Sequence, residues 1–384
     1  MAAQSVRVEV PAELYEWAIE RSRVDRGNLA RRFPKLVTWL ASENSPTLKQ
    51  LEAFARATHT PIGFFFLAEP PVEAVPIPDF RTLGDRQVTR PSADLLDTLY
   101  QCQQRQEWFH DYAQANRFDP VPFVSSCTLD SAVADAAAQM QEVLSFSVNE
   151  RGASWGEAFT QLRERAEEVG VLVMVNGVVG SNTHRKLDPD EFRGFALADP
   201  LAPLVFVNGA DTRAAQIFTL AHELAHLWLG ESALSDVALD VESTNATERW
   251  CNQVAAELLV PLVDLRDQFD TGRDLTEELD RLARRFRAST LVVLRRVQEA
   301  GYLSWPAYRA AYTAERQRVL ALMGDGGSGG NFYNTQPVRV SKLFARSVIA
   351  STLEGHTLYR DALDMLGFKK ISTFNELAGR LGVA

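Results

Sequence analysis

The spacing of hydrophobic and polar positions predicts that the chain begins with a compact helical unit. In residues 11–66, apolar positions recur at helical spacing, as in "PAELYEWAIERS" and "GNLARRFPKLVTWL". Ser45-Pro46-Thr47 is a typical helix start and precedes a further run of this kind, with apolar residues at Leu48 and Leu51. The pattern therefore predicts four or five short helices before the first proline-rich stretch.

The pattern changes in residues 154–260, where strands and helices are mixed. "WGEAFTQLRERAEEVG" predicts an amphipathic helix that ends at Gly170. "VLVMVNGVV", "EFRGFALAD" and "PLVFVNG" are short apolar or alternating runs bounded by Gly, Asn and Asp, which is typical of strands. Because further helical patterns flank this region on both sides, the predicted fold class is α+β.

Helical patterns at 91–116 and 129–144 precede this mixed region. After Pro261, "LDRLARRFRASTLVVLRRVQEAGYLS" predicts a pair of helices. "GDGGSGGN" at 324–331 is typical of a flexible loop, and a last helical segment is expected from about residue 338.

Composition adds that the chain is an ordinary globular protein without a membrane span. Of its 384 residues 46% are hydrophobic and 23% are charged, and the mean hydropathy is −0.15. No apolar run approaches the length of a transmembrane helix, and "MAAQSVRVEV" lacks the apolar core of a secretory signal. Three widely separated cysteines favour a reducing compartment. We therefore expect a cytoplasmic protein with no membrane partner.

Residues 11–66 resemble the small helix-turn-helix domain of phage-type repressors, most clearly over "TLKQLEAFARATHTPIGFFF". The whole chain carries a net charge of −10, but residues 1–60 hold nine Lys and Arg against seven Asp and Glu, which permits DNA contact. "FPKLVTWLASEN", where a recognition helix should lie, offers one Lys and few side chains suited to base edges. The alternative is a helical bundle used for packing or dimerisation.

Candidate chemistry is concentrated in "QIFTLAHELAHLWLG", which contains the pattern H-E-x-x-H. On a helix, His222 and His226 lie one turn apart on the same face, so both can direct a ring nitrogen at one Zn²⁺. Glu223 is then close enough to take a proton from a water on the metal and pass it to a leaving amine. Apolar residues surround the histidines, and Gly230 is expected to end the helix.

A catalytic zinc ion needs a third protein ligand, and Glu248 in "TERWCNQVAAELLVP" is the best candidate. Asn252 follows it at helical spacing and can orient a ligand imidazole. Glu257 and Glu242 are the competing third ligands. Cys251 places a thiol beside this segment, where it can bind zinc in a latent form or simply be a small buried residue.

A group that stabilises the reaction's oxyanion should also exist. His184, in "GSNTHRK", and Arg213 are candidates for this role, although exposed histidines in loops commonly have no function.

Together, "PLVFVN", "FTLAHELAHLWLG" and "ERWCNQVAAELLVP" resemble the ImmA/IrrE family of zinc metallopeptidases over about residues 155–262. The repressor-like N-terminus and "PDFR" (Pro78 to Arg81) match the long form of that family, and "GGNFYNTQ" resembles its C-terminal extension. The resemblance implies a zincin-like domain with a small sheet, in which His222, His226 and Glu248 bind Zn²⁺ and Glu223 is the general base.

The resemblance implies five segments, which are a repressor-like helix-turn-helix domain at 1–67, a proline-rich linker with helices at 68–150, the peptidase domain at 151–265, a helical extension at 266–322 and a C-terminal helical segment at 323–384. It also implies a regulatory endopeptidase that cleaves a specific protein, such as a helix-turn-helix repressor or a neighbouring-gene product, in a stress, mobile-element or toxin–antitoxin circuit. Binding of DNA through residues 1–67 and formation of a homodimer are both compatible with this function. The alternative is a DNA- or toxin-binding regulator or antitoxin with a structural or latent zinc site.

Overall fold

The computed structural model describes residues 6–80, 90–235, 245–322 and 338–383. These divide into two compact units, one formed by residues up to Pro76 together with Arg86–Tyr100, the other by Ile77–Asp85 together with Gln101–Ala384. None of the helices in the described ranges combines the length and the apolar character that a membrane span requires.

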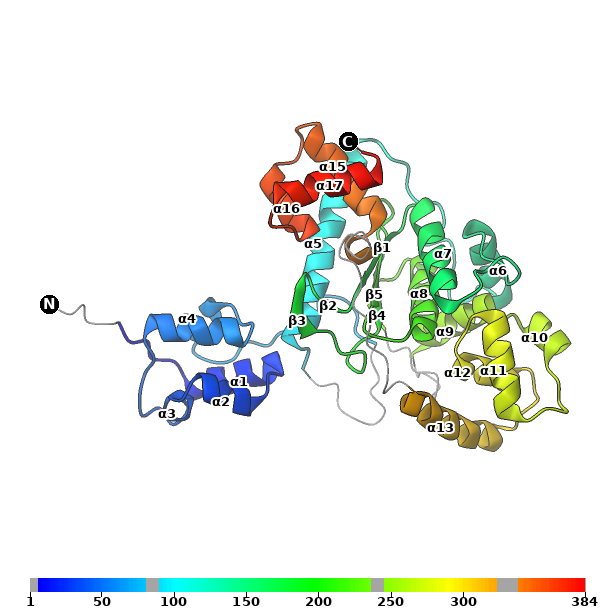
Figure 1. Cartoon of the computed structure of the whole chain (residues 1–384), viewed down its shortest axis with the longest axis horizontal. Coiled ribbons are helices and arrows are strands. Elements are labelled where there is room, and N and C mark those ends of the chain that lie inside the picture. The colour runs from blue at the N-terminus through cyan, green and yellow to red at the C-terminus, as the bar shows by residue number, and fades with distance from the viewer. Residues whose placement is uncertain (1–5, 81–89, 236–244, 323–337, 384) are drawn as a thin grey trace. The chain divides into compact units, whose positions relative to one another are not determined.

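The first unit is the predicted bundle of short helices (Figure 1). Its elements are α1 (Ala12–Ser22), α2 (Arg26–Arg32), α3 (Leu36–Leu40), α4 (Leu48–Ala57) and the 3₁₀ helix η1 (Ile62–Phe66). Thr47 begins α4 as predicted, since its hydroxyl accepts the Gln50 N–H in a capping box. Tyr15, Phe54 and Phe65 are fully or almost fully buried and form the aromatic core of the unit.

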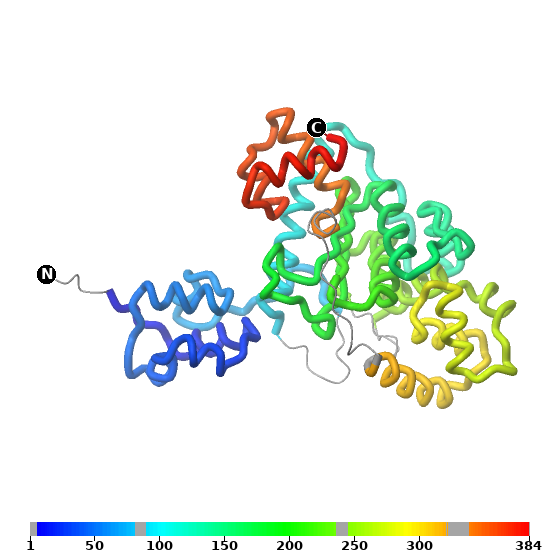
Figure 2. Tube along the Cα trace, in the orientation of Figure 1, coloured from blue at the N-terminus to red at the C-terminus, as the bar shows by residue number. Residues whose placement is uncertain are grey.

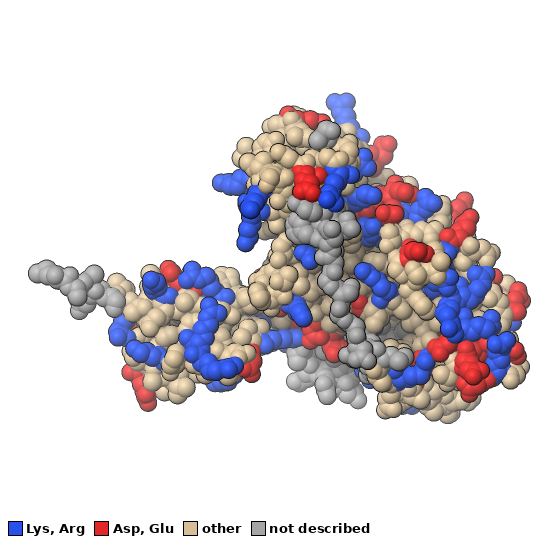
Figure 3. All heavy atoms as spheres, viewed as in Figure 1, with Lys and Arg blue, Asp and Glu red and all other residues tan. Residues whose placement is uncertain are grey.

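The segment expected to hold a recognition helix forms only a short one. α3 has five residues, and its Leu36 and Trp39 are directed into the aromatic core. Val37, on the opposite side, is 68% exposed. In Figure 3, basic and acidic side chains are interspersed on the visible faces of both units. The helix-turn-helix identity of this unit therefore remains a prediction.

The second unit contains a four-stranded mixed sheet in the order β1-β5-β4-β6. Its strands are β1 (Leu172–Asn176), β4 (Gly194–Leu197), β5 (Leu204–Asn208) and β6 (Ala233–Leu234), and β2 (Val178–Val179) pairs with β3 (Asn182–Lys186) in a separate hairpin. β1 and β5 are parallel, whereas β4 is antiparallel to both β5 and β6. The three apolar runs of the sequence are thus strands, as predicted.

Helices cover both faces of this sheet (Figure 1). One face packs against α8 (Arg213–Leu229), which in turn contacts α7 (Trp155–Glu168) and α9 (Ala246–Leu259). On the other face the Cys102 thiol of α5 (Ala93–Ala115) lies 3.8 Å from the Met174 sulfur of β1. The unit is therefore α+β, and α8 lies in its core.

The remaining helices of this unit lie before and after the sheet in the sequence. They are α6 (Val133–Val143), α10 (Leu262–Gln268), α11 (Leu275–Phe286), α12 (Thr290–Glu299), α13 (Trp305–Leu322), α15 (Lys342–Leu353), α16 (Tyr359–Leu366) and α17 (Ile371–Leu381). Figure 2 traces the last three, in orange and red, beside α5 and the β1 side of the sheet. Glu167 of α7 anchors them, because its carboxylate accepts the Ser341 hydroxyl at 2.6 Å and the Lys342 N–H at 2.7 Å. The "GDGGSGGN" loop predicted at 324–331 lies outside the described residues.

Candidate metal centre

Helix α8 presents the H-E-x-x-H residues inside the core of the second unit. Thr212 begins the helix by accepting the Ala215 N–H, and Gly230 ends it with a φ of 71°, as the sequence predicts. A side chain at Gly230 would be strained by this backbone conformation and would collide with Ser125. Both ends of the helix are therefore defined, and with them the positions of the two histidines along the helix axis.

Helix α9 places Glu248 opposite these histidines. The Asn245 side chain caps α9 by accepting the N–H groups of Thr247 and Glu248, at 2.8 and 3.3 Å. Glu248 thus lies in the first turn of a helix that packs directly against α8. It is completely buried, as a carboxylate is in proteins only when a partner compensates for the loss of water.

The three predicted ligands converge on one point. The Nε2 atoms of His222 and His226 lie 3.1 Å apart. Glu248 places Oε1 3.1 Å from His226 Nε2 and Oε2 3.4 Å from His222 Nε2. All of these residues are 0% exposed, and among the described residues they form the only cluster of three or more His, Cys, Asp or Glu with metal-binding spacing.

This geometry fits a zinc ion. Ligand atoms about 2.0–2.2 Å from one tetrahedral zinc lie about 3.4 Å from one another, close to the observed separations. Within the described residues, neither Glu248 oxygen makes a hydrogen bond and neither histidine Nδ1 has a partner. A cation between these buried nitrogens and the carboxylate would compensate for their burial, and two histidines with one glutamate are a ligand set used by catalytic zinc.

Glu223 lies beside this cluster in a space that glycine provides. A Cβ atom on Gly194 of β4 would lie 3.0 Å from Glu223 Oε1 and 2.8 Å from the Phe206 carbonyl oxygen. The other carboxylate oxygen, Oε2, accepts the Ser235 hydroxyl at 3.2 Å. Ser235 is buried, and its oxygen also lies 3.2 Å from His226 Nε2. Sequence reasoning missed both Gly194 and Ser235, which contact Glu223 from β4 and from the end of β6.

The electrostatics favour the protonation states that metal binding requires. Burial lowers the pKa of His226, which favours the neutral imidazole that metal binding requires. Burial alone would raise the pKa of Glu248, but the facing imidazoles of His222 and His226 outweigh that effect and lower it to about 2. Burial, and then the charge of Glu248, raise the pKa of Glu223 well above its ordinary value. Glu223 is therefore the carboxylate in this centre with the greatest tendency to accept a proton.

The alternatives for a third ligand have different surroundings. Glu257 forms an ion pair with Arg296 and accepts the Leu262 N–H, so it belongs to the α9–α12 contact. Glu242 lies outside the described residues. Burial raises the pKa of the Cys251 thiol, with smaller contributions from Glu248 and Glu223, and this thiol is not part of the ligand cluster. Cys251 is therefore a small buried residue of α9.

Within the described residues, the accessory residues predicted from the sequence show no hydrogen bond to the proposed metal ligands. Asn252 lies one turn after Glu248, but its Oδ1 makes no hydrogen bond within the described residues, to a histidine or to any other group. His184 is exposed on the β2–β3 hairpin. Arg213 lies at the start of α8, with its guanidinium 5.4 Å from the Phe159 ring centre and donating to Gln216. The oxyanion-stabilising group therefore remains unassigned.

A short segment missed by sequence reasoning as part of the site lies against His226. The Phe80 ring is stacked near the His226 imidazole, with ring centres 6.5 Å apart and planes at 23°. The backbone of Phe80 pairs with Leu234 of β6. The motif "PDFR" is visible in the sequence, but nothing in its local pattern predicts that it contacts a residue so far along the chain.

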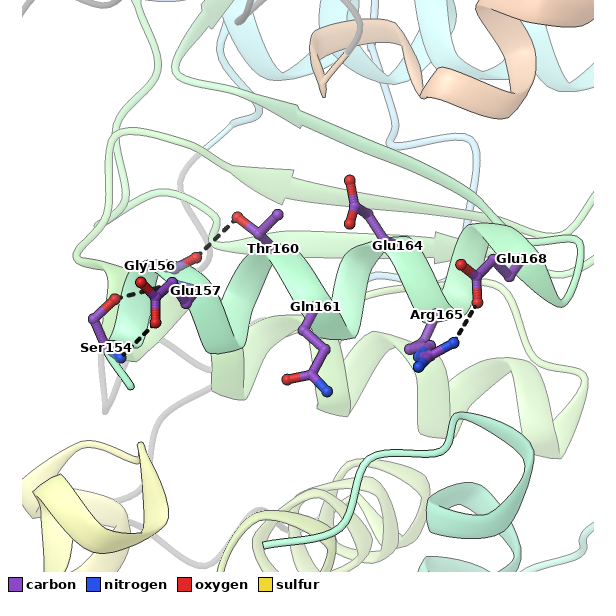
Figure 4. A pocket seen from close by; sticks show the side chains of 8 residues that line it. All are labelled: Ser154, Gly156, Glu157, Thr160, Gln161, Glu164, Arg165 and Glu168. Carbon is purple, nitrogen blue, oxygen red and sulfur yellow. Dashed lines mark hydrogen bonds and ion pairs between the residues drawn. The ribbon is translucent and has the colours of Figure 1, made fainter. Parts of the chain in front are cut away.

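A surface hollow of about 600 Å³ lies away from this centre and contains no comparable chemistry (Figure 4). Its described lining comes from α7 and the cap residue before it, and comprises Ser154, Gly156, Glu157, Thr160, Gln161, Glu164, Arg165 and Glu168. The polar groups drawn there interact mainly with one another along α7. Ser154 and Glu157 form a capping box, and Arg165 pairs with Glu168 at 2.9 Å.

Comparisons with known proteins agree with the geometry. Residues 166–298, which span the sheet, α8 and α9, match the model of the IrrE N-terminal-like domain, a peptidase family. The match supports the resemblance to the ImmA/IrrE family. Residues 340–380 match a domain of unknown function, and a search of curated proteins finds no match.

Proposed function

We propose that the α8–α9 centre binds one zinc ion and that the chain is a regulatory zinc-dependent endopeptidase. The observation that carries this proposal is the convergence of His222, His226 and Glu248 at 3.1–3.4 Å, with Glu223 buried beside them. The match of residues 166–298 to a peptidase family supports the same reaction class.

In this proposal the roles follow from the positions of the side chains. His222, His226 and Glu248 would hold the zinc, which when bound supplies Lewis-acid chemistry to a peptide carbonyl and to water. Glu223 would accept a proton from the attacking water and return it to the leaving nitrogen. Ser235 would hold the Glu223 carboxylate, because its hydroxyl donates to Oε2.

We propose a specific protein as the substrate, such as a helix-turn-helix repressor or the product of a neighbouring gene. The presence of a separate helical unit before the peptidase domain supports a dedicated target, because that unit can dock on the target, on DNA or on a second copy of the chain. An extended segment of the target would add to the edge of the sheet near the centre.

The test is incubation of a candidate repressor with the zinc-loaded full chain and with its Glu223→Gln variant. Glu376→Gln, on the exposed side of α17, is the matched control for a glutamate replaced at a distance. Wild type and control should cleave the repressor at the same bond, and Glu223→Gln should not. Equal cleavage by all three proteins would remove the proposed mechanism.

One observation favours the second candidate, a DNA- or toxin-binding regulator with a latent zinc site. His222, Glu223, His226 and Glu248 are all 0% exposed, so the centre in this conformation admits no peptide. If Glu223→Gln retains full biological function while surface substitutions within residues 20–60 abolish it, the binding function is the correct one.

A further inference from the structure

The complete burial of the four centre residues is the starting point, because a peptidase must expose its reacting groups to a peptide. Their side chains are all 0% exposed. A group that covers them must therefore move before any substrate can bind.

The described segment Pro78–Phe80 lies beside the centre at the edge of the sheet. The Phe80 N–H donates to the Leu234 carbonyl at 2.9 Å, and the Leu234 N–H donates to the Pro78 carbonyl at 2.9 Å. Asp79 thereby forms a parallel bridge with Leu234, on the side of β6 that does not face β4. The segment thus occupies the position of one further strand, which is how an extended peptide adds to an exposed edge.

The Phe80 side chain lies between this paired edge and the centre. Its ring is stacked near the imidazole of His226, a proposed metal ligand, at 6.5 Å between ring centres. The next residue after the paired Leu234 is Ser235, whose hydroxyl holds Glu223. Main-chain pairing with β6 therefore places the side chain at the Phe80 position beside His226.

The segment lies largely at the surface of the second unit. Pro78 and Asp79 are exposed, and Phe80 is half-buried. Pro78 has no N–H, so on its side the pairing cannot continue as a regular ladder. By contrast, β1, the strand at the other edge of the sheet, contacts helix α15.

We propose that the outer edge of β6 is the peptide-docking site of the centre and that Pro78–Phe80 is its resident intramolecular ligand. The site takes extended peptides that present an aromatic side chain beside His226, and such a peptide must displace the segment. This inference rests on the proposed function, because it names the class of substrate for the same centre.

The experiment measures peptide binding without requiring cleavage. The full chain, zinc-loaded and carrying Glu223→Gln, is titrated against a fluorescein-labelled peptide that copies residues 74–80, and binding is followed by anisotropy. In this background Phe80→Ala empties the aromatic position, Phe80→Tyr keeps a ring, and Val72→Ala alters an exposed residue of the same linker. Removing the internal competitor raises the fraction of binding-competent protein, so Phe80→Ala should bind the peptide about tenfold more tightly.

The matched variants define the outcomes. Phe80→Tyr and Val72→Ala should bind as the parent does, and a peptide with Ala at the Phe80 position should bind Phe80→Ala at least about tenfold more weakly. Equal peptide affinity of Phe80→Ala and the parent overturns the inference, as does equal affinity for the two peptides. Phe80→Pro removes both the ring and the donating N–H, so it should bind the parent peptide at least as tightly as Phe80→Ala does.

Amide exchange at Leu234 reports the same event inside the folded protein. Because its N–H donates to Pro78, exchange should accelerate in Phe80→Ala while the amides of α8 remain protected. If Phe80→Ala binds peptide more tightly but wild type cleaves no protein, docking stands and the peptidase function fails. If wild type cleaves its target and Phe80→Ala changes neither binding nor exchange, the peptidase stands and the docking inference fails.

Discussion

The N-terminal helical unit and the α8–α9 pair are both built from capped helices around large apolar side chains, but they bury different polar groups. Among the described residues of the N-terminal core, the buried side-chain atoms that lack a hydrogen-bond partner are the Tyr15 hydroxyl and the Trp39 indole nitrogen, both neutral. Between α8 and α9, the described atoms without a hydrogen-bond partner include an imidazole nitrogen of His222 and carboxylate oxygens of Glu223 and Glu248.

The difference is informative because burying an ionisable group without a partner is costly, far more than burying a phenol. Folding alone gives no reason to place two carboxylates and two imidazoles at the centre of a helix pair. Such exceptions to core chemistry occur where a ligand compensates for the cost or where a reaction uses the groups. The N-terminal unit contains no comparable cluster among its described residues, so it serves as the internal reference.

The largest effect expected is on catalysis. Glu223→Gln removes the proton acceptor while retaining its shape, so the cleavage rate should fall about 10²- to 10⁴-fold. The bound zinc should remain near the wild-type level, because Glu223 is not one of the three converging ligands. The check is the initial rate of target cleavage together with zinc content. A variant that retains the wild-type rate would show that the buried carboxylate has no part in the reaction.

The next effect is on stability when zinc is removed. Chelation should lower hydrogen-exchange protection of α8 and α9 by several kcal/mol, because the buried groups lose the cation that compensates for their burial. α1 and α4, in the N-terminal unit, should keep their protection, and this contrast is measured in one exchange experiment on the full chain. Equal loss in both units would mean that the metal does not act at the α8–α9 centre.

A smaller effect should depend on pH in the metal-free protein. Burial and the charge of Glu248 raise the pKa of Glu223 above its ordinary 4.5, so the stability associated with protonated Glu223 is present below about pH 4.5 and is lost as pH rises through the raised pKa. Glu223→Gln does not lose this stability, because a glutamine does not ionise. It should therefore be more stable than wild type by about 1–3 kcal/mol at pH 8, and the gain should shrink towards pH 4.5.

This pH dependence is measured by denaturant unfolding of both proteins from pH 4.5 to 8. The lowered pKa of His226 destabilises both proteins as pH falls below 6.5, so it largely cancels in the difference between them. A difference that stays constant with pH would contradict the raised pKa of Glu223.

The smallest effect compares two glycines, one in each unit. Gly194→Ala places a Cβ 2.8 Å from the Phe206 carbonyl and 3.0 Å from Glu223 Oε1, and should destabilise the protein by about 1–3 kcal/mol while lowering activity. Gly63→Ala in η1 meets nothing within 4 Å and should change stability by less than about 0.5 kcal/mol. Thermal unfolding of the two variants measures this difference. Equal shifts of their unfolding temperatures would contradict it.

The residues whose positions depend on one helix could be predicted from the sequence. His222 and His226 share a face because their spacing is that of a helical turn, and Gly230 ends the helix because it adopts a positive φ. Glu248 was placed by a second helical pattern, and the structure brings it within 3.4 Å of both histidines. The α+β class and the strands could be predicted in the same way, from the spacing of apolar residues and from the Gly, Asn and Asp residues that bound the apolar runs.

Residues brought to the centre by long-range pairing could not be predicted. Ser235 and Phe80 depend on β6, a strand of two residues that is too short to produce an alternating pattern. Gly194 appears in the sequence as one glycine among 22, and only the packing of β4 on α8 shows why it has no side chain. The role predicted for Asn252 has no supporting contact within the described residues.

Metal analysis of the purified full chain beside His222→Ala tests the central claim most directly. The account predicts about one zinc per chain in the wild type after loading and removal of excess metal, and almost none in the variant, because one of three protein ligands is lost. Circular dichroism should first establish that both proteins are folded. A wild type that retains no zinc, or a folded variant that retains as much as the wild type, would contradict the assignment of His222, His226 and Glu248 as a zinc centre.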